Sequence, residues 1–253
     1  MSPSDPASPS HAASILTIDL AAVAANYRLL ADRAAPARCA GVVKADAYGL
    51  GLAPVANALA AAGCETFFVA LLEEGIALRE LLPEATIMIL NGLMAGEAPV
   101  FEAHRLVPVL NDLGQIEEWG AHCKSGTAQP ATLQLDTGMS RLGMPPEEVE
   151  RLAAEPDRLA GIALEGVMSH LACADEPNHP MNRRQLEDFM AARTRLPAAT
   201  ASLAASSGIF LGPEWHFDLV RPGVALYGVA PTRGESNPMT QVIRLKGKIL
   251  QVR

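Results

Sequence analysis

Apolar and polar positions follow two periods along this chain, one typical of helices and one typical of buried strands. Leu20, Val23, Ala24 and Tyr27 recur at the spacing of one helical face, and Asp19 stands where that helix would begin. Short apolar runs follow that are too brief for a helix. The pattern therefore predicts an amphipathic helix from Asp19 and then a buried strand.

The same alternation continues to about residue 230. Strand-like runs cover residues 39–43, 66–70, 86–90, 106–110, 131–135, 162–168, 199–205 and 219–227. Helix-like segments lie between them, over residues 55–62, 73–82, 97–103, 115–123, 145 onwards and 181–195. Eight strands separated by helices in this length predict an α/β fold, a (β/α)8 TIM-type barrel over residues 15–237. A doubly wound open sheet shares the alternation, but no GxGxxG motif follows the first strand.

The two ends of the chain depart from this pattern. Residues 1–14 are rich in Ser, Pro and Ala and lack both the basic start and the apolar stretch of a signal peptide, so we expect a disordered tail. Residues 238–253 mix branched apolar and basic side chains, as strands do. We interpret them as the first strand of a C-terminal β domain of which this chain lacks the remainder.

Charge and composition exclude several classes of protein. A net charge of −8 argues against binding to nucleic-acid backbones, and no apolar run reaches the length of a membrane span. Cys39, Cys64, Cys123 and Cys173 are widely spaced and have no metal-binding pattern, so we predict free thiols in a reducing cytoplasm and no bound metal.

Lys44 is the most informative single residue. It directly follows an apolar strand-like run and precedes Tyr48, Gly49 and Gly51. A lysine at such a strand end can be desolvated and act as a neutral amine, which can form a Schiff base, and a nearby hydroxyl and flexible backbone suit a phosphate. These are the requirements of pyridoxal phosphate (PLP). The simpler interpretation is a surface lysine that closes a strand.

Four further polar groups follow other predicted strands. Arg141 lies in a glycine-bracketed loop, His170 ends the strand 162–168, Ser206 follows the seventh strand, and Arg221 lies in the eighth. Each has a structural alternative: a loop arginine paired with a neighbouring aspartate, a hydrogen-bonded histidine, a helix-capping serine, or an arginine that braces a turn. In a barrel, however, all of them open onto one mouth at the C-terminal ends of the strands.

Three segments together carry a family resemblance. Residues 43–51 (VKADAYGLG) closely resemble the PLP attachment signature of alanine racemases, and residues 135–143 (LDTGMSRLG) and 221–228 (RPGVALYG) resemble two further motifs of that family in the same order. The resemblance implies a cytoplasmic PLP enzyme that interconverts L-alanine and D-alanine and supplies D-alanine for peptidoglycan. It also implies a homodimer of the full-length protein.

The resemblance assigns a role to each motif residue. Lys44 would hold PLP covalently and act as one of two acid/base groups at the substrate α-carbon. Tyr48 would bind the phosphate, and Ser206 would complete the phosphate site with the backbone N–H groups near Gly223 and Val224.

Around the cofactor ring, the resemblance places three more residues. Arg141 would lie near the phenolic oxygen and the substrate carboxylate, and His170 would lie beside the ring, linked to Arg221. Because arginine does not give up its proton, a ring nitrogen that faces Arg221 should stay unprotonated. The cofactor would then be a weaker electron sink, which favours rapid reprotonation over transamination.

The chain departs from the family pattern at three points. Ala205 stands where an asparagine is usual. Gln134 stands where many members have a carbamylated lysine that supports the arginine at the position of Arg141. The second catalytic base of the family is a tyrosine of the C-terminal domain, and none of the three tyrosines of this chain follows that motif. Racemisation needs acid/base groups on both faces, so we expect this chain to bind PLP and racemise poorly.

Two other functions stay open at this stage. One is a non-catalytic PLP-binding barrel that stores or delivers the cofactor. The other is racemisation of serine or another small amino acid on the same scaffold, because residues lining the mouth select substrate size.

Overall fold

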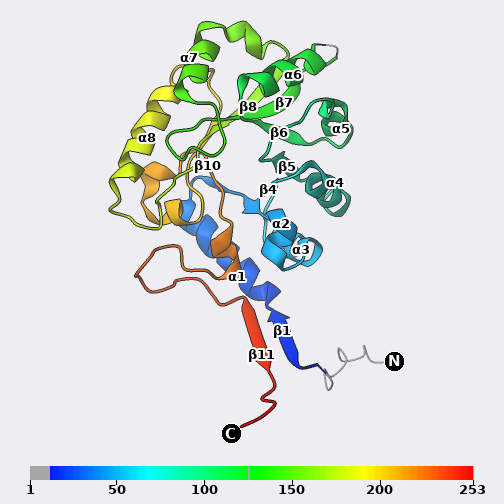
Figure 1. The fold of residues 1–253 in the computed structure, drawn as a ribbon, viewed down its shortest axis with the longest axis vertical. Helices are drawn as coiled ribbons and strands as arrows, with labels where there is room; N and C mark the ends of the chain where they lie inside the picture. The colour runs from blue at the N-terminus through cyan, green and yellow to red at the C-terminus, as the bar shows by residue number, and fades with distance from the viewer. Residues whose placement is uncertain (1–11, 125, 253) are drawn as a thin grey trace.

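The computed structural model describes residues 12–124 and 126–252 (Figure 1). Most of the predicted N-terminal tail lies outside this part of the chain. The first element, β1 (Ser14–Ile18), directly precedes helix α1 (Leu20–Ala34). The Asp19 side chain accepts a hydrogen bond from the N–H of Ala22 at 3.0 Å, which caps α1 at the residue where the sequence predicts its start.

Parallel strands form the centre of the molecule. They are β2 (Arg38–Cys39), β3 (Gly41–Val42), β4 (Thr66–Val69), β5 (Thr86–Ile89), β6 (Val107–Leu110), β7 (Gln129–Gln134), β8 (Ile162–Met168), β9 (Thr200–Ser202) and β10 (Leu219–Val220). Strands β3 to β9 pair in sequence order, and β2 pairs with β10. Since only Ala40 separates β2 from β3, the two act as one bent strand, which gives the eight strands that the sequence predicts.

The sheet closes on itself through β10. On one side the N–H of Asp218 donates to the carbonyl of Ala201 at 3.0 Å. On the other, the N–H of Arg38 donates to the carbonyl of Asp218 at 3.0 Å, and that of Ala40 to the carbonyl of Val220 at 2.9 Å. Backbone hydrogen bonds therefore run round the whole barrel, and the prediction of a (β/α)8-type α/β fold is confirmed.

Helices follow most of the strands and cover the outside of the barrel (Figure 1). They are α3 (Leu52–Ala61), α4 (Leu72–Leu81), α5 (Ala98–Ala103), α6 (Leu113–Cys123), α7 (Pro146–Ala154) and α8 (Pro180–Arg193). A short turn, α2 (Lys44–Gly49), and the 3-10 turns η1 (Pro156–Leu159), η2 (Ser207–Phe210), η3 (Pro213–Trp215) and η4 (Val224–Tyr227) complete the set.

Two apolar clusters hold these layers together. The larger one joins the helices to the strands and includes Phe67, Phe101, Trp119 and Phe189, all at most 1% exposed. The smaller one contains Phe68, Met88 and Met168 together with Ala40, Val42, Val107, Val109 and Leu219. Successive side chains of a strand point to opposite faces of the sheet, so the neighbours Phe67 and Phe68 belong to different clusters. The barrel is thus packed on both of its faces.

One predicted strand is only partly correct. The prediction for residues 219–227 is wrong beyond Val220, where β10 ends and the chain continues through Pro222 and Gly223 into η4. Proline cannot donate to a sheet, and Gly223 adopts φ −125° and ψ −86°, which is not a strand conformation. The chain leaves the sheet here, at the barrel mouth.

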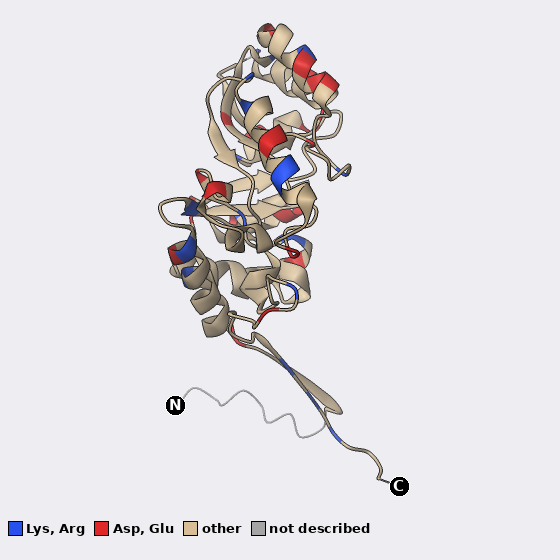
Figure 2. Cartoon of the chain, turned by 90° about the vertical axis from the view of Figure 1, so that its left-hand side faces the viewer, with Lys and Arg blue, Asp and Glu red and all other residues tan. Residues whose placement is uncertain are grey.

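The strand predicted near the C-terminal end is present as β11 (Ile243–Gly247). It pairs antiparallel with β1, a strand that the sequence analysis does not predict. Figure 2 shows this two-stranded ribbon extending away from the barrel, with basic residues along it. The assignment of residues 238–253 to a second domain stays a prediction.

Two sequence-level expectations can be compared with the described residues directly. Cys39, Cys64, Cys123 and Cys173 are free thiols that are buried or partly buried, as predicted. Over the same residues, no helix has the combination of length and apolar character that a membrane crossing requires.

Candidate active site

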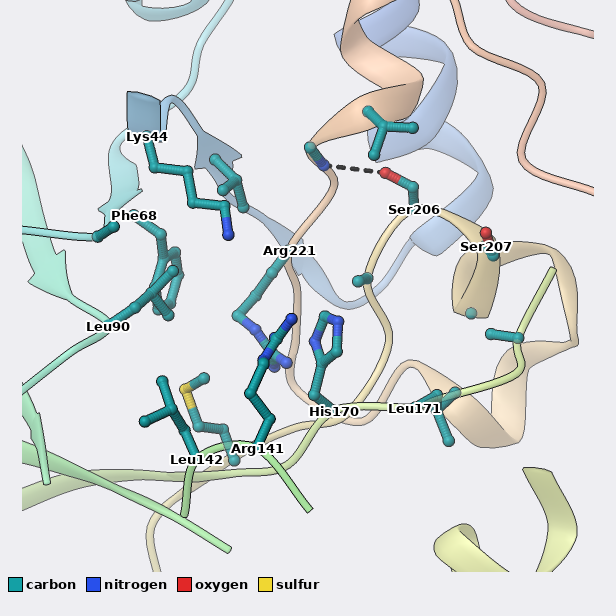
Figure 3. Close-up of a pocket in the computed structure, with 18 of the residues that line it drawn as sticks. Lys44, Phe68, Leu90, Arg141, Leu142, His170, Leu171, Ser206, Ser207 and Arg221 are labelled. Atoms are coloured by element: carbon teal, nitrogen blue, oxygen red, sulfur yellow. Dashed lines mark hydrogen bonds between the residues drawn. The ribbon is translucent and has the colours of Figure 1, made fainter. Parts of the chain in front are cut away.

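A cavity of about 480 Å³ lies at the C-terminal ends of the barrel strands. All of the residues selected from the sequence line it: Lys44, Tyr48, Arg141, His170, Ser206, Arg221, Gly223 and Val224. Figure 3 shows the side chains of Lys44, Arg141, His170 and Arg221 converging on the same space from different loops. The structure therefore brings together residues that are up to 180 positions apart in the sequence.

Lys44 begins a turn with an unusual backbone. Ala45, Asp46, Ala47 and Tyr48 all have φ between 52° and 57°, the left-handed region that costs non-glycine residues roughly 1–2 kcal/mol each. The sequence suggests a turn relaxed by Gly49 and Gly51, but the turn itself consists of side-chain-bearing residues. Such a turn needs contacts from its surroundings to persist.

Hydrogen bonds from neighbouring segments supply part of that support. The N–H of Ala47 donates to the carbonyl of Val43 at 2.9 Å, and the N–H of Leu52 donates to Asp46 Oδ1 at 2.6 Å. The N–H of Ala45 donates to Glu74 Oε1 at 2.5 Å. The turn is thus tied to its own strand, to α3 and to α4.

The environment of Lys44 favours a neutral amine. Burial lowers the pKa of its ammonium group, and the positive charge of Arg141 lowers it further, while Glu74 acts in the opposite direction. Its amino group points into the cavity in Figure 3. A lysine with a lowered pKa has more unprotonated amine at neutral pH, and this is the form that attacks carbonyl groups.

The phenol of Tyr48 lies against two neighbours at the cavity wall. Its ring packs on the ring of Tyr227 with centroids 4.8 Å apart, and Tyr227 donates a hydrogen bond to the carbonyl of Val42 at 2.9 Å. A Cβ atom placed on Gly223 would lie 2.5 Å from Tyr48 Oη. Glycine at position 223 therefore lets the Tyr48 hydroxyl approach the start of η4 closely.

Ser206 forms a bridge between two loops of the mouth. Its Oγ accepts hydrogen bonds from the N–H of Gly223 at 2.9 Å and from the N–H of Ala225 at 3.2 Å. The sequence analysis expects the N–H of Gly223 to face a phosphate, but in this structure it donates to Ser206. The hydroxyl proton of Ser206 remains available as a donor.

Arg221 lies at the base of the cavity and is 3% exposed. Its guanidinium donates to Ser202 Oγ and to the carbonyl of Ser169, the latter at 2.6 Å. It also lies 6.0 Å from the centre of the Phe68 ring. Burial lowers the pKa of Arg221 to about 10, so the side chain is positively charged at neutral pH. Among its hydrogen-bond partners in the described structure there is no carboxylate.

His170 stands beside Arg221 but is not hydrogen-bonded to it in the described structure (Figure 3). The expected link between them is replaced by contact through the backbone, since Arg221 binds the carbonyl of Ser169, the residue before His170. Burial lowers the pKa of His170 to about 3, and the charges of Arg221, Arg141 and Lys44 act in the same direction. The imidazole is therefore neutral at physiological pH.

Arg141 is exposed at the rim, in a loop held by its backbone. Asp136 Oδ1 accepts hydrogen bonds from the N–H groups of Gly138 at 2.9 Å and Ser140 at 3.0 Å, and it forms no ion pair with Arg141 in the described structure. Gln134 donates to the carbonyl of Leu142 at 3.2 Å. Gln134 therefore supports the loop rather than the guanidinium, and Arg141 is available to an anion.

The charges around the cavity favour a negatively charged ligand. Arg141 and Arg221 contribute cations, Lys44 adds a positive charge when its amine is protonated, and Asp175 is the one residue with a carboxylate among those described as lining it. The chain as a whole carries a charge of −8. A local basic pocket in an acidic protein indicates a site for a small anionic ligand.

Comparison with known proteins identifies the family of the chain. The profile of the family described as "Alanine racemase, N-terminal domain" matches residues 18–231, which is most of the chain. The chain belongs to the alanine racemase family.

Full-length relatives show how much of such a protein this chain represents. It is 52% identical over 245 residues to the alanine racemase of Rhodospirillum rubrum, covering 96% of this chain and 66% of the relative. It is 53% identical over 250 residues to a catabolic alanine racemase of Mesorhizobium japonicum, covering 98% of the chain and again 66% of the relative. The chain thus spans slightly less than two thirds of these relatives.

Solved structures agree with the sequence comparison. The alanine racemase of Bartonella henselae, whose crystal structure contains covalently bound pyridoxal phosphate, superposes with a TM-score of 0.92 at 42% identity, covering 96% of this chain and 71% of that one. The biosynthetic alanine racemase of Pseudomonas aeruginosa superposes with a TM-score of 0.83 at 35% identity, covering 92% and 65%. The barrel described above is the barrel of this family.

The structure shows a buried residue behind the candidate site that the sequence analysis does not find. Gln185 of α8 is fully buried and donates to the carbonyl of His170 at 2.9 Å and to Thr137 Oγ1 at 3.3 Å. Its Oε1 accepts from the N–H of Ala172 at 2.9 Å. Asn182 and Gln185 are three residues apart and so fall on one face of the predicted helix, the apolar one. Polar side chains at such positions indicate buried hydrogen bonds, and this signal is present in the sequence.

Proposed function

We propose that this chain is the cofactor-binding barrel of an alanine racemase, with Lys44 as the covalent attachment point of PLP. The observation that carries the proposal is the convergence of Lys44, Tyr48, Arg141 and Arg221 on one cavity in a member of this family. The relative from Bartonella henselae holds the same cofactor covalently.

The residues present fit PLP. The cavity volume is within the range of small-molecule sites, at roughly 300–1,000 Å³. A partly desolvated lysine suits the aldehyde of PLP, and the excess of cations suits its phosphate. Ser206 accepts the N–H of Gly223, and the hydroxyl of Tyr48 lies close to the same glycine, so these two side chains form the wall against which we place that phosphate.

When bound, PLP supplies the electron-withdrawing group that makes the α-proton of an attached amino acid acidic. The lowered pKa of Lys44 leaves more of its amine unprotonated at neutral pH than in an exposed lysine, so Lys44 is the candidate group to accept the α-proton and return it. Arg141, exposed at the rim, is the candidate to bind the substrate carboxylate.

Arg221 and His170 set the electrostatics at the base of the site. Arg221 is charged and can only donate, so an acceptor nitrogen placed against it stays unprotonated. His170 is neutral and adds no further positive charge there. The pair favours rapid return of a proton to the substrate over diversion of the reaction to transamination.

Racemisation requires proton transfer on both faces of a planar carbon. Besides Lys44, the described cavity lining offers Tyr48, whose pKa is raised by burial, His170, whose pKa is about 3, and the carboxylate of Asp175. Tyr48 and His170 are poor acid/base partners near pH 7, and we assign no role to Asp175 because it lies outside the three motifs of the site. We therefore expect this 253-residue chain to remove the α-proton of alanine and return it mostly on the same face.

Incubation with PLP and L-alanine in D₂O tests this proposal. We expect α-deuterium to enter L-alanine faster than D-alanine forms, both signals being lost in Lys44→Ala. Comparable rates of the two processes would mean that the chain contains a second catalytic group. PLP binding without any exchange would favour a non-catalytic PLP-binding barrel instead.

The substrate and the assembly of the whole protein are parts of the same proposal. We propose alanine as the substrate because the chain belongs to the alanine racemase family. The same exchange assay with serine and other small amino acids tests this choice. The homodimer stays a prediction.

A further inference from the structure

Glu74 lies on α4, next to the turn that carries Lys44, and it is outside the motifs that define the candidate site. Its side chain is partly buried, whereas the neighbouring Glu73 is exposed. Among the described residues, Glu74 is the acidic group whose charge raises the pKa of Lys44.

The Glu74 carboxylate binds three backbone N–H groups from two different segments. Oε2 accepts from Ala70 at 2.8 Å and from Leu71 at 3.1 Å, at the start of its own helix. Oε1 accepts from Ala45 at 2.5 Å. The first pair is a local helix cap, but the third bond crosses from the β4–α4 unit to the residue after Lys44.

We propose that Glu74 is a positioning residue for Lys44, one that clamps the left-handed turn to α4 and so aims the lysine amine into the cavity. This inference rests on the proposed function, because it concerns how the chain presents Lys44 to PLP. It deepens that function by adding a residue that touches neither substrate nor cofactor.

The strain of the turn explains why such a clamp is needed. Ala45 is the first of the four residues with positive φ, so the bond from Glu74 reaches the point where the backbone leaves the strand. Side-chain-bearing residues hold this conformation only when surrounding contacts fix it. A charged acceptor forms stronger hydrogen bonds than a neutral one, which suits this task.

The charge of Glu74 also has a direct effect on the lysine. Burial and Arg141 lower the pKa of Lys44, and Glu74 alone opposes them among the groups that act on it. Asp46, in the turn itself, has its carboxylate bound to the N–H of Leu52. Glu74 therefore limits how far the amine is neutralised, in addition to fixing where it lies.

The test uses three variants of the 253-residue chain. Glu74→Gln removes the charge and leaves one amide N–H facing a backbone donor, Glu74→Asp keeps the charge but shortens the reach, and Glu73→Gln is the matched control on the same helix. Two quantities are measured for each: hydrogen exchange of the amides of residues 45–51 without cofactor, and the rate of borohydride-trappable PLP attachment to Lys44 as a function of pH.

We expect the amides of the turn to exchange faster in Glu74→Gln than in Glu73→Gln. The rate plateau at high pH, where the amine is neutral in every variant, should fall on the order of tenfold in Glu74→Gln, because the amine is misplaced. The pH midpoint of attachment should move to lower pH in Glu74→Gln and stay closer to that of the unmodified chain in Glu74→Asp. A mere helix cap would lower thermal stability without moving that midpoint.

The outcomes separate this inference from the proposed function. If the unmodified chain attaches no PLP at Lys44, the proposed function fails. If it does attach PLP, and Glu74→Gln matches Glu73→Gln in exchange, plateau and midpoint, then only the role of Glu74 is refuted.

Discussion

The guanidinium of Arg221 donates a hydrogen bond to the carbonyl oxygen of Ser169 at 2.6 Å. This contact joins the loop after the last barrel strand to the residue that precedes His170. Through a second bond, to Ser202, the same group reaches the strand between them. One buried cation thus fixes the base of the cavity from three strand ends, and within residues 12–124 and 126–252 it has no carboxylate partner.

The first prediction concerns this cation. Arg221→Lys keeps the charge but cannot make the two directed bonds of a guanidinium, so we expect a loss of about 2–3 kcal/mol in the free energy of unfolding. Urea denaturation measures it, and Arg244→Lys on the exposed ribbon serves as control. An unchanged midpoint in Arg221→Lys would show that the two bonds are not important for stability.

Gly223 offers a steric test of the phosphate wall. A Cβ atom there would lie 2.5 Å from Tyr48 Oη, so Gly223→Ala should displace the phenol. We expect PLP affinity to fall by about tenfold or more, the effect of losing roughly one charged hydrogen bond, with little change in thermal stability. Gly126→Ala, where a Cβ meets open space, is the control. Equal PLP affinities of the two variants would remove Tyr48 from the proposed phosphate site.

The positions of the barrel strands and of the residues that line the cavity were predictable from the sequence only in part. Short apolar runs define all eight strands because strands of a parallel barrel are buried on both faces, and the rule that polar groups gather at strand ends brings Lys44, Arg141, His170 and Arg221 together. The strand positions, and the gathering of these four residues at the strand ends, therefore follow from local patterns in the sequence.

Features that depend on distant contacts were not predictable in this way. The left-handed conformation of Ala45 to Tyr48 contradicts local preference, since none of these residues is a glycine. The bond from Glu74 to Ala45 spans 29 positions, and that from Asn26 to Leu226 spans 200. The early end of β10 is different, because it follows from Pro222 and Gly223, which interrupt the apolar pattern of residues 219–227 in the sequence itself.

Gln185 should be important for both stability and the site. Gln185→Leu leaves the carbonyl of His170 and the N–H of Ala172 without their buried partner, so we expect a loss of about 2–4 kcal/mol in the free energy of unfolding. Chemical denaturation provides the value, with Glu187→Ala on the exposed face of the same helix for comparison. A difference below about 0.5 kcal/mol between the two would contradict the network.

His170 should make the folded state sensitive to acid. The pKa of His170 is about 3 in the folded chain and about 6.5 in the unfolded chain. On acidification, the imidazole is therefore protonated in the unfolded chain while it is still neutral in the folded chain. The stability contributed above pH 6.5 is therefore lost progressively as the pH falls toward 3. Between pH 7.5 and 5.0 this amounts to about 1–2 kcal/mol.

Melting temperatures at those two pH values measure this loss. We expect His170→Gln to show a smaller decrease than the unmodified chain, while His104→Gln retains the full decrease. An identical pH dependence in all three proteins would mean that the pKa of His170 does not differ between the folded and the unfolded chain.

The central claim is that Lys44 is the residue that binds PLP covalently. Its most direct test is peptide mass spectrometry of the chain after incubation with PLP and reduction with borohydride. The reduced cofactor mass is predicted on the peptide that contains Lys44, and on no peptide from Lys44→Ala at the same PLP concentration. Labelling spread over the exposed Lys124, Lys246 and Lys248, with Lys44 unmodified, would contradict it.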